Sequence, residues 1–322
     1  MDIGSLKSKW DNIQSFQNKS GYKALRISSE CICDLFIATD VDGYRCLLLF
    51  IPERIVIKIK GAEKDKLMLS YLDNKGIILI KLKDPDFIDL FNDLILSLYA
   101  KIKCISEPKE ASQELIYTFY KWSDFFEDSF KHKLNNEQIQ GLFGELFVLN
   151  EFLINSNPSN VNSFLESWKG PYDTTNDFVF DTKNIEVKTK IESKPFVKIS
   201  SEFQLEKEFD KELELLVVSV KIDLINGESI YDLIIKIVKM VRENIGDLSI
   251  LFHALNQKGL SIENLKEYNN HRFIVLKTEL FDASKEDFPK LSKSNIENEI
   301  TGLSYRLRVT QMDKFLIAEK KY

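Results

Sequence analysis

Three charged residues lie close together in the stretch NDFVFDTKNIEVKTK, which spans residues 176–190. Apolar residues on both sides of the polar segment D-T-K-N predict two short strands joined by a turn. Asp177 stands at the start of the first strand, and Glu186 and Lys188 are two positions apart on the second. Side chains two apart on a strand share a face, so Glu186 and Lys188 are expected to lie side by side. By itself this stretch fits both an ordinary surface hairpin and a metal site.

The residue types in this hairpin suit one kind of metal chemistry. Asp177 and Glu186, together with the backbone carbonyl of Val187, would provide hard oxygen ligands of the kind that Mg²⁺ prefers. An ion bound there could stabilise charge on a phosphoryl group and lower the pKa of a bound water. Lys188 would then orient that water and offset negative charge in the transition state.

Glu145 is a fourth candidate, in the helical segment 137–153, EQIQGLFGELFVLNEFL. Apolar residues surround most of this segment, which predicts a deeply buried helix that begins near residues 135–136. A buried carboxylate needs a partner, because an unpaired buried charge is very costly. A salt bridge would satisfy Glu145, and so would the cation of the hairpin site, reached directly or through water.

The elements around the hairpin predict its fold class. Residues 164–168, FLESW, are expected to form a strand; residues 201–209, SEFQLEKEF, a helix that begins at Ser200 or Ser201; and residues 214–222, ELLVVSVKI, a buried strand. The predicted class is α/β (α+β), with an αβββαβ core around a mixed central sheet. This core is expected between about residues 136 and 223.

Three regions are expected along the chain. Residues 1–105 combine strand-like runs, one of them at 53–61, with a helix that opens at Asp84-Pro85, which predicts a small α+β domain. Residues 106–235 hold the core with its leading helices, and residues 236–322 are expected to form a C-terminal extension that packs on it.

Composition excludes several classes of protein. A chain of 322 residues with 44% hydrophobic and 29% charged residues is typical of a soluble protein of about two domains. Its apolar runs are far shorter than the ~20 residues of a membrane span, so we expect a cytoplasmic protein with no membrane partner. Three histidines leave little material for a histidine-rich site, and the chain lacks the glycine-rich P-loop motif. The four cysteines are expected to be free thiols in the core.

The net charge of −6 argues against a protein that coats nucleic acid nonspecifically. A local basic patch would still be enough for a DNA enzyme. Five lysines gather around the hairpin: Lys183, Lys188, Lys190, Lys194 and Lys198. A solvated lysine face would explain them equally well without the neighbouring acids.

The Glu-x-Lys element alone is a weak signal, because it occurs four times in the chain. The copies at 107–109 and 192–194 contain or precede a proline, and the copy at 319–321 lies in a polar tail. Only residues 186–188 stand on a predicted interior strand behind an acid, and this context strengthens the metal-site interpretation.

With these residues in view, the chain resembles the PD-(D/E)XK nuclease superfamily. The resemblance rests on D177-x(8)-E186-V-K188 and on the preceding helix with Glu145. The segments GLFGELFVL, W-K-G-P, N-D-F, I-E-V-K-T and I-S-S-x-x-Q-L further resemble a bacterial branch of that superfamily. Asn176 stands where the superfamily often has proline.

The resemblance implies a Mg²⁺-dependent DNA endonuclease, with Mn²⁺ as a substitute, of a kind often found in restriction or anti-phage defence systems. It implies that Asp177 and Glu186 are metal ligands, Lys188 the catalytic lysine and Glu145 an auxiliary acid. Some branches also use a glutamine on the next helix, which here would be Gln204. An alternative for Gln204 is a capping box with Ser201, and Trp168 is expected to be a core aromatic.

Two functions remain open from the sequence. One is an endonuclease that acts on DNA, as a homodimer if it cuts both strands. The other is a catalytically silent nuclease-fold subunit that binds nucleic acid or scaffolds a defence complex. In either case methyltransferase or ATPase partners would have to be separate chains.

Overall fold

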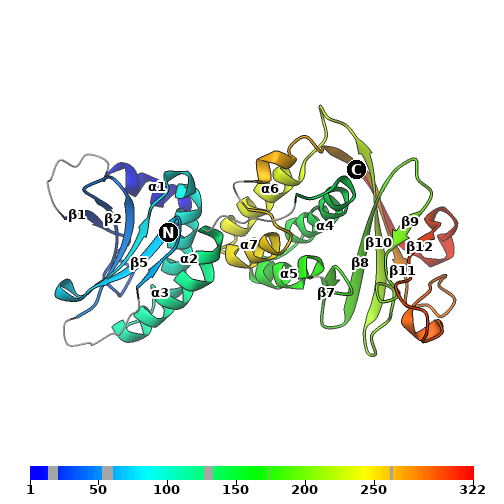
Figure 1. The fold of residues 1–322 in the computed structure, drawn as a ribbon, viewed down its shortest axis with the longest axis horizontal. Coiled ribbons are helices and arrows are strands. Elements are labelled where there is room, and N and C mark those ends of the chain that lie inside the picture. Colours follow the sequence, from blue (N-terminus) through cyan, green and yellow to red (C-terminus); the bar gives the residue numbers. More distant parts are fainter. Residues whose placement is uncertain (14–20, 53–60, 127–132, 173, 262–263) are drawn as a thin grey trace. The chain divides into compact units, whose positions relative to one another are not determined.

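The chain divides into two compact units, and its computed structural model describes residues 1–13, 21–52, 61–126, 133–172, 174–261 and 264–322 (Figure 1). The first unit comprises Met1–Ser129 with Asp247–Ser249, and the second comprises Phe130–Gly246 and Ile250–Tyr322. The division near residue 105 expected from the sequence therefore differs from the one observed. Helix α3 (Pro108–Ser123) packs against α2 (Ile88–Ile102) and belongs with the first unit.

The first unit contains an antiparallel six-stranded sheet in the order β1-β2-β3-β6-β5-β4. Its described helices include α1 (Ile3–Asp11), α2 and α3. Asp84 accepts a hydrogen bond from the Asp86 N–H and Pro85 follows it, so the helical segment opens where the sequence predicts. The strand expected at 53–61 lies almost wholly outside the described residues. The strands are β1 (Tyr22–Arg26), β2 (Leu35–Asp40), β3 (Arg45–Phe50), β4 (Ala62–Glu63), β5 (Leu67–Leu72) and β6 (Ile77–Leu82).

The second unit is built on a mixed five-stranded sheet in the order β13-β11-β10-β8-β7. Strands β8 and β10 run parallel, and the other neighbours are antiparallel. The expected α+β class with a mixed sheet is confirmed. The strands are β7 (Phe178–Val179), β8 (Lys183–Ile191), β10 (Glu212–Ile222), β11 (Phe273–Asp282) and β13 (Leu316–Lys321).

Helices cover one face of this sheet and a two-stranded ribbon covers the other (Figure 1). The helices are α4 (Asn136–Ile154), α5 (Val161–Ser167), α6 (Ile230–Glu243) and α7 (Leu248–Gln257). The ribbon pairs β9 (Val197–Ile199) with β12 (Tyr305–Leu307). Its inward residues Val197, Ile199 and Leu307 join Leu213, Leu215 and Val217 of β10 in one buried apolar cluster. The ribbon is thereby fixed to the sheet by apolar packing.

Helix α4 begins where its sequence predicts. The Asn135 side chain accepts a hydrogen bond from the Gln138 N–H, and the Gln138 side chain accepts one from the Asn135 N–H, which completes a capping box. Apolar residues all around the helix are buried. The predicted deep burial of this helix is therefore confirmed.

Two expected elements are wrong. Residues 164–168 lie in helix α5 and the residue after it, rather than in a strand. Residues 201–209 form turns and irregular backbone instead of a helix, and two of their side chains accept hydrogen bonds from backbone N–H groups. Glu202 accepts from the Leu303 N–H and Gln204 from the Ser200 N–H.

The αβββαβ order therefore fails at its first strand, which is helical, and at its second helix: α6 follows β10 instead and packs on α4. The region 236–322 is also more than an extension, because it supplies β11 and β13 to the central sheet.

None of the helices in the described ranges is both long and apolar enough to cross a membrane. All four cysteines are free, and Cys31, Cys33 and Cys46 are buried as expected, whereas Cys104 is exposed and so does not belong to the core.

Candidate active site

Strand β8 holds Glu186 and Lys188 side by side, as their spacing predicts. The Lys188 ammonium lies 2.6 Å from Oε1 of Glu186, and both side chains are largely buried. In the register of β8 and β10, Glu186 pairs with Leu215 and Lys188 with Val217. Neighbouring residues in register point to the same face, so Glu186 and Lys188 lie on the side of the sheet that the ribbon covers.

Asp177 reaches β8 at the edge that β7 leaves free. Strand β7 is only two residues long and pairs with Asn184 and Ile185 alone. Beyond that point Oδ2 of Asp177 accepts a hydrogen bond of 2.7 Å from the Val187 N–H. A short strand thus leaves the backbone of β8 open to the acid that precedes it.

The carbonyl of Val187 is oriented toward the same edge. The N–H and C=O groups of one strand residue point to the same side of the strand. Since the Val187 N–H points to Asp177, the Val187 carbonyl faces that side as well. The structure therefore leaves this carbonyl available as the backbone ligand that the sequence predicts.

Glu145 comes to the site from α4 because a glycine lets the helix approach β8 closely. A β-carbon added to Gly144 would lie 1.8 Å from Oγ1 of Thr189. One turn earlier, Nε2 of Gln140 donates a 2.8 Å hydrogen bond to the Thr189 carbonyl. These two contacts fix the position of α4, and with it Glu145, along strand β8.

The residues around Gly170 bring Glu145 and Asp177 together. The carbonyl of Asp177 accepts hydrogen bonds from the N–H groups of Lys169 and Gly170, at 2.7 and 3.0 Å. A β-carbon on Gly170 would lie 2.4 Å from Oε2 of Glu145 and 2.8 Å from Oδ1 of Asp177. The two carboxylates therefore approach one point, which only a glycine leaves open.

Trp168 is buried, as expected of a core aromatic, but it also has a polar role that the sequence did not reveal. Its indole Nε1–H donates a 2.8 Å hydrogen bond to Oε2 of Glu145. The tetrapeptide W-K-G-P, which contains Trp168 and Gly170, was the signal that could have indicated both positions.

Burial and mutual repulsion leave the carboxylates poorly compensated. Burial, reinforced by the charge of Asp177, raises the pKa of Glu145 and the pKa of Glu186 to about 8 in each case. Burial also raises the pKa of Asp177, against the opposing influence of Lys188 and the Val187 N–H. Burial alone would lower the pKa of Lys188, but the carboxylates of Glu186 and Asp177 raise it above its ordinary value.

The donor chemistry of the site suits a hard divalent cation. Carboxylate oxygens of Glu145 and Asp177 flank one point, the Glu186 carboxylate lies on the adjoining strand, and the candidate ligands among the described residues are oxygens. A cation there would relieve the repulsion that raises the pKa values of these acids. Within the described ranges, however, no three acidic, histidine or cysteine side chains converge closely enough to hold a metal by themselves. Any bound ion would complete its shell with water, the Val187 carbonyl or a substrate oxygen.

Gln204 lies near these residues, but its side chain is held by the backbone. Its Oε1 accepts a 2.8 Å hydrogen bond from the Ser200 N–H, and its carbonyl accepts one from the side chain of Asn176. The sequence offered two roles for Gln204, a catalytic one and a capping box with Ser201. The observed hydrogen bond is of the second kind, but it comes from Ser200 and stabilises a turn instead of the start of a helix.

A cavity of about 700 Å³ opens at the free edge of β8. Glu145, Asp177, Val187 and Lys188 line it, whereas Glu186 lies behind its wall. It receives side chains from α4, from β8 and from the ribbon, segments that are far apart in the chain.

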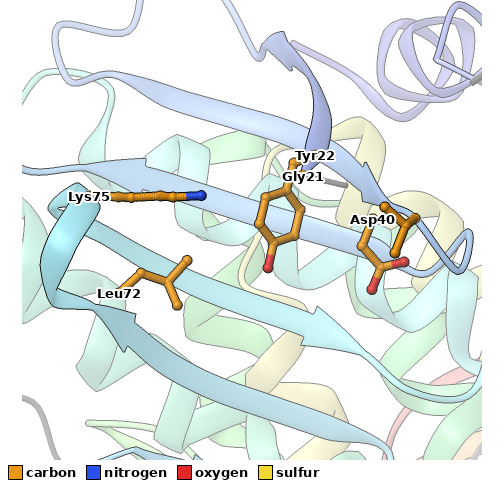
Figure 2. Close-up of a pocket in the computed structure, with 6 residues that line it drawn as sticks. Gly21, Tyr22, Asp40, Leu72 and Lys75 are labelled. Carbon is orange, nitrogen blue, oxygen red and sulfur yellow. The ribbon is translucent and has the colours of Figure 1, made fainter. Parts of the chain in front are cut away.

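A second hollow lies on the sheet of the first unit, where Figure 2 shows the side chains of Tyr22, Asp40, Leu72 and Lys75. Asp40 there accepts hydrogen bonds from the N–H groups of Asp42 and Tyr44 and from the ammonium of Lys81. Its carboxylate is thus engaged in holding a turn and a strand, and it is the only acid among the described residues that line the hollow.

Comparison with known proteins supports the resemblance seen in the motifs. A family model described as "Putative PD-(D/E)XK family member (DUF4420)" matches residues 6–310. No curated protein matches the chain, and no solved structure does. Since the family match spans most of the chain, the resemblance is confirmed.

Proposed function

We propose that the chain, which belongs to the family of PD-(D/E)XK members described above, is a Mg²⁺-dependent nuclease that hydrolyses phosphodiester bonds in DNA. One observation carries the proposal: Glu145, Asp177 and the Glu186–Lys188 pair come from separate segments and meet at the free edge of β8. Mn²⁺ would substitute for Mg²⁺ at such an oxygen site.

In this proposal Asp177, Glu145 and the Val187 carbonyl hold the ion, and Glu186 contributes a carboxylate oxygen. When bound, Mg²⁺ would lower the pKa of a coordinated water and stabilise negative charge on the phosphoryl group. Trp168 orients Glu145, and the Val187 N–H orients Asp177. These hydrogen bonds hold the carboxylates in place before substrate arrives.

Lys188 acts in this mechanism as a cation and a hydrogen-bond donor. The carboxylates of Glu186 and Asp177 raise its pKa, so it keeps its proton at neutral pH. A protonated lysine cannot take a proton from the attacking water. It can orient that water or donate to a nonbridging phosphate oxygen, where it offsets the charge that develops in the transition state.

The catalytically silent subunit is the second candidate, because no three side chains of the described part of the chain make a complete metal site. In that case the acids would remain partly protonated and the fold would serve only to bind nucleic acid or to scaffold other subunits. Metal binding separates the two functions.

Calorimetric titration with Mn²⁺ and Mg²⁺, with and without duplex DNA, tests the proposal. The variant Asp177→Asn keeps an acceptor for the Val187 N–H but loses the charge, so we expect it to bind neither ion. Asp181→Asn is a matched control, because Asp181 is an exposed acid of the same hairpin. If wild type binds no metal even with DNA present, the silent subunit is the better description.

Cleavage of plasmid and linear DNA then tests the reaction. We expect Lys188→Met to lower the rate by about 10²–10³-fold, the range found when one charge-stabilising group is removed from an active site. Wild-type cleavage that is insensitive to both Asp177→Asn and Lys188→Met would exclude this site as the catalytic centre.

A place in a bacterial restriction or anti-phage defence system is supported by the resemblance of the motifs. A homodimer would supply two sites for the two strands, and methyltransferase or ATPase subunits would be separate chains. This role would be supported if bacteria that express the wild-type protein show a lower efficiency of phage plating, while bacteria that express Asp177→Asn do not.

A further inference from the structure

The cavity beside the candidate site has the opposite charge balance to the chain. The protein as a whole carries 44 basic and 50 acidic residues. The described residues of the cavity wall include six basic side chains, Lys188, Lys190, Lys194, Lys198, Lys258 and Arg306, and three acidic ones, Glu137, Glu145 and Asp177. A surface that is locally basic on an acidic protein attracts anions to that place.

Two of these cations face each other on the ribbon. In the antiparallel register of β9 and β12, Lys198 lies directly opposite Arg306. Both side chains are exposed, because the alternate residues Val197, Ile199 and Leu307 point into the apolar cluster. Like charges directly opposite each other on neighbouring strands are destabilising.

No acidic side chain of the described part of the chain forms an ion pair with either of these two cations, Lys198 and Arg306. The comparison with Lys277 and Lys321, which are opposite each other on β11 and β13, is informative. There Lys277 pairs with Glu279 and Glu319, and Lys321 also pairs with Glu319. Among the described residues, the cation pair of the ribbon therefore lacks the acidic partners that the Lys277–Lys321 pair has.

The orientation of Arg306 is set by an aromatic ring. Its guanidinium lies 4.6 Å from the centroid of the Phe196 ring, and Phe196 also lines the cavity. Stacking on an aromatic ring holds the planar guanidinium in place and leaves its N–H groups free for an anion. This arrangement suits the oxygens of a phosphodiester, which arginine can bind through two N–H groups.

The ribbon covers the sheet face from which Lys188 projects. Its inward residues pack on Leu215 and Val217, the register neighbours of Glu186 and Lys188. The cation pair and the candidate catalytic lysine therefore line one continuous cavity. A polyanion that crosses this cavity would meet both.

We infer that Lys198 and Arg306 form a phosphate clamp, which binds the backbone of a nucleic-acid strand on one side of the phosphodiester to be cleaved. The inference rests on the proposed function for the identity of the strand, but binding itself requires no cleavage. The clamp makes backbone contacts, so it contributes affinity without reading sequence.

Salt-dependent binding tests the clamp. The probes are a fluorescein-labelled DNA duplex and an RNA duplex of the same sequence, measured by anisotropy in Ca²⁺ over a range of KCl concentrations. Each lost phosphate contact lowers the slope of log affinity against log salt by about one. We therefore expect the double variant Lys198→Ala/Arg306→Ala to bind more weakly than wild type, with a slope lower by about two.

The matched control is Lys236→Ala/Lys239→Ala, which removes the same charge from two exposed lysines of α6 outside the cavity wall. The variant Arg306→Lys, which keeps the charge, should retain the wild-type slope and lose only the affinity that depends on the guanidinium. The preferred duplex identifies whether DNA or RNA occupies the clamp.

Three results would overturn the inference. They are equal slopes for wild type and the ribbon variant, an equal loss in the α6 control, and no binding of either duplex by wild type. Failure of the proposed nuclease function gives a different pattern, since the ribbon variant would then still bind more weakly than wild type while neither protein cleaves DNA.

Discussion

The indole N–H of Trp168 donates a 2.8 Å hydrogen bond to Oε2 of Glu145, and the backbone of Trp168 forms a bridge with Phe178. Phe178 follows Asp177 directly in the chain. One buried tryptophan thus ties the helix that carries Glu145 to the strand that follows Asp177. We regard Trp168 as a positioning residue for the candidate site.

Replacing Trp168 with phenylalanine removes this hydrogen bond and keeps most of the apolar volume. We expect metal affinity to fall by about 10–100-fold, the usual effect of losing a group that orients a metal ligand. Calorimetric titration with Mn²⁺ measures this change. In cleavage assays the metal concentration for half-maximal rate should rise more than the maximal rate falls.

Trp10→Phe is the matched control for that variant. Nε1 of Trp10 donates a buried 2.9 Å hydrogen bond to Asn92 in the first unit, so the same atoms and one hydrogen bond are removed. If both variants lose equal metal affinity, the effect of Trp168 reflects general destabilisation and the positioning role is wrong.

Gly144→Ala should destabilise the second unit by about 1–3 kcal/mol, because its β-carbon would lie 1.8 Å from Oγ1 of Thr189. Chemical denaturation measures the free energy of unfolding. Adding Thr189→Ala removes the hydroxyl from the clash and should recover part of the loss.

Gly141→Ala, on the same helix, provides the control for Gly144→Ala. A β-carbon at Gly141 would meet no atom within 4 Å. Since alanine is a better helix former than glycine, we expect a gain of about 0.5–1 kcal/mol. Equal effects of the two substitutions would contradict the close approach of α4 to β8.

Gly170→Ala should impair metal binding more than it impairs folding. The new β-carbon would lie 2.4 Å from Oε2 of Glu145 and 2.8 Å from Oδ1 of Asp177, so the two carboxylates would have to separate. Titration with Mn²⁺ should show at least a tenfold loss of affinity, because groups that merely orient metal ligands already change metal affinity by about 10–100-fold when they are lost. The unfolding temperature of the metal-free protein should change little or even rise, because the repulsion between the two carboxylates weakens when they separate. Unchanged metal affinity would show that the ion does not bind between these two acids.

The stability of the metal-free protein should fall as pH rises from about 5 to 8. The pKa values of Glu145 and Glu186 are raised from 4.5 to about 8 in the folded protein. Between these values the folded state binds protons that the unfolded state has lost, so the free energy of unfolding decreases with rising pH. Each group contributes at most about 1.4 kcal/mol per pH unit.

Thermal unfolding in the presence of a chelator measures this pH dependence. Glu145→Gln, which keeps an acceptor for Trp168, should unfold at a higher temperature than wild type at pH 8 and show a weaker pH dependence. Mg²⁺ or Mn²⁺ should stabilise the wild-type protein most near pH 8, where the acids are least protonated. A stability that rises with pH between 5 and 8 would contradict the burial of these carboxylates.

The local pattern of the sequence was sufficient for much of the second unit. The spacing of two between Glu186 and Lys188 predicts a shared face because strand side chains alternate, and the capping residues Asn135 and Gln138 predict the start of α4. These features depend on neighbouring residues only. The prediction failed at residues 164–168 and 201–209, where short amphipathic runs fit both a helix and another structure. There, contacts with distant groups such as the Leu303 N–H decided the conformation.

The sequence by itself determined which residues could do the chemistry: a carboxylate before a strand, the Glu-x-Lys pair on the next strand and a glutamate in an apolar helix. It could not show that Trp168 binds Glu145, that Gly170 leaves room for two carboxylates, or that Arg306 faces Lys198. Such relationships join residues that are far apart in the chain. They depend on how closely α4 approaches β8 and on how the ribbon packs on the sheet. Only the tertiary structure decides these distances, because they result from the packing of whole elements, whereas periodicity and capping act within a few residues.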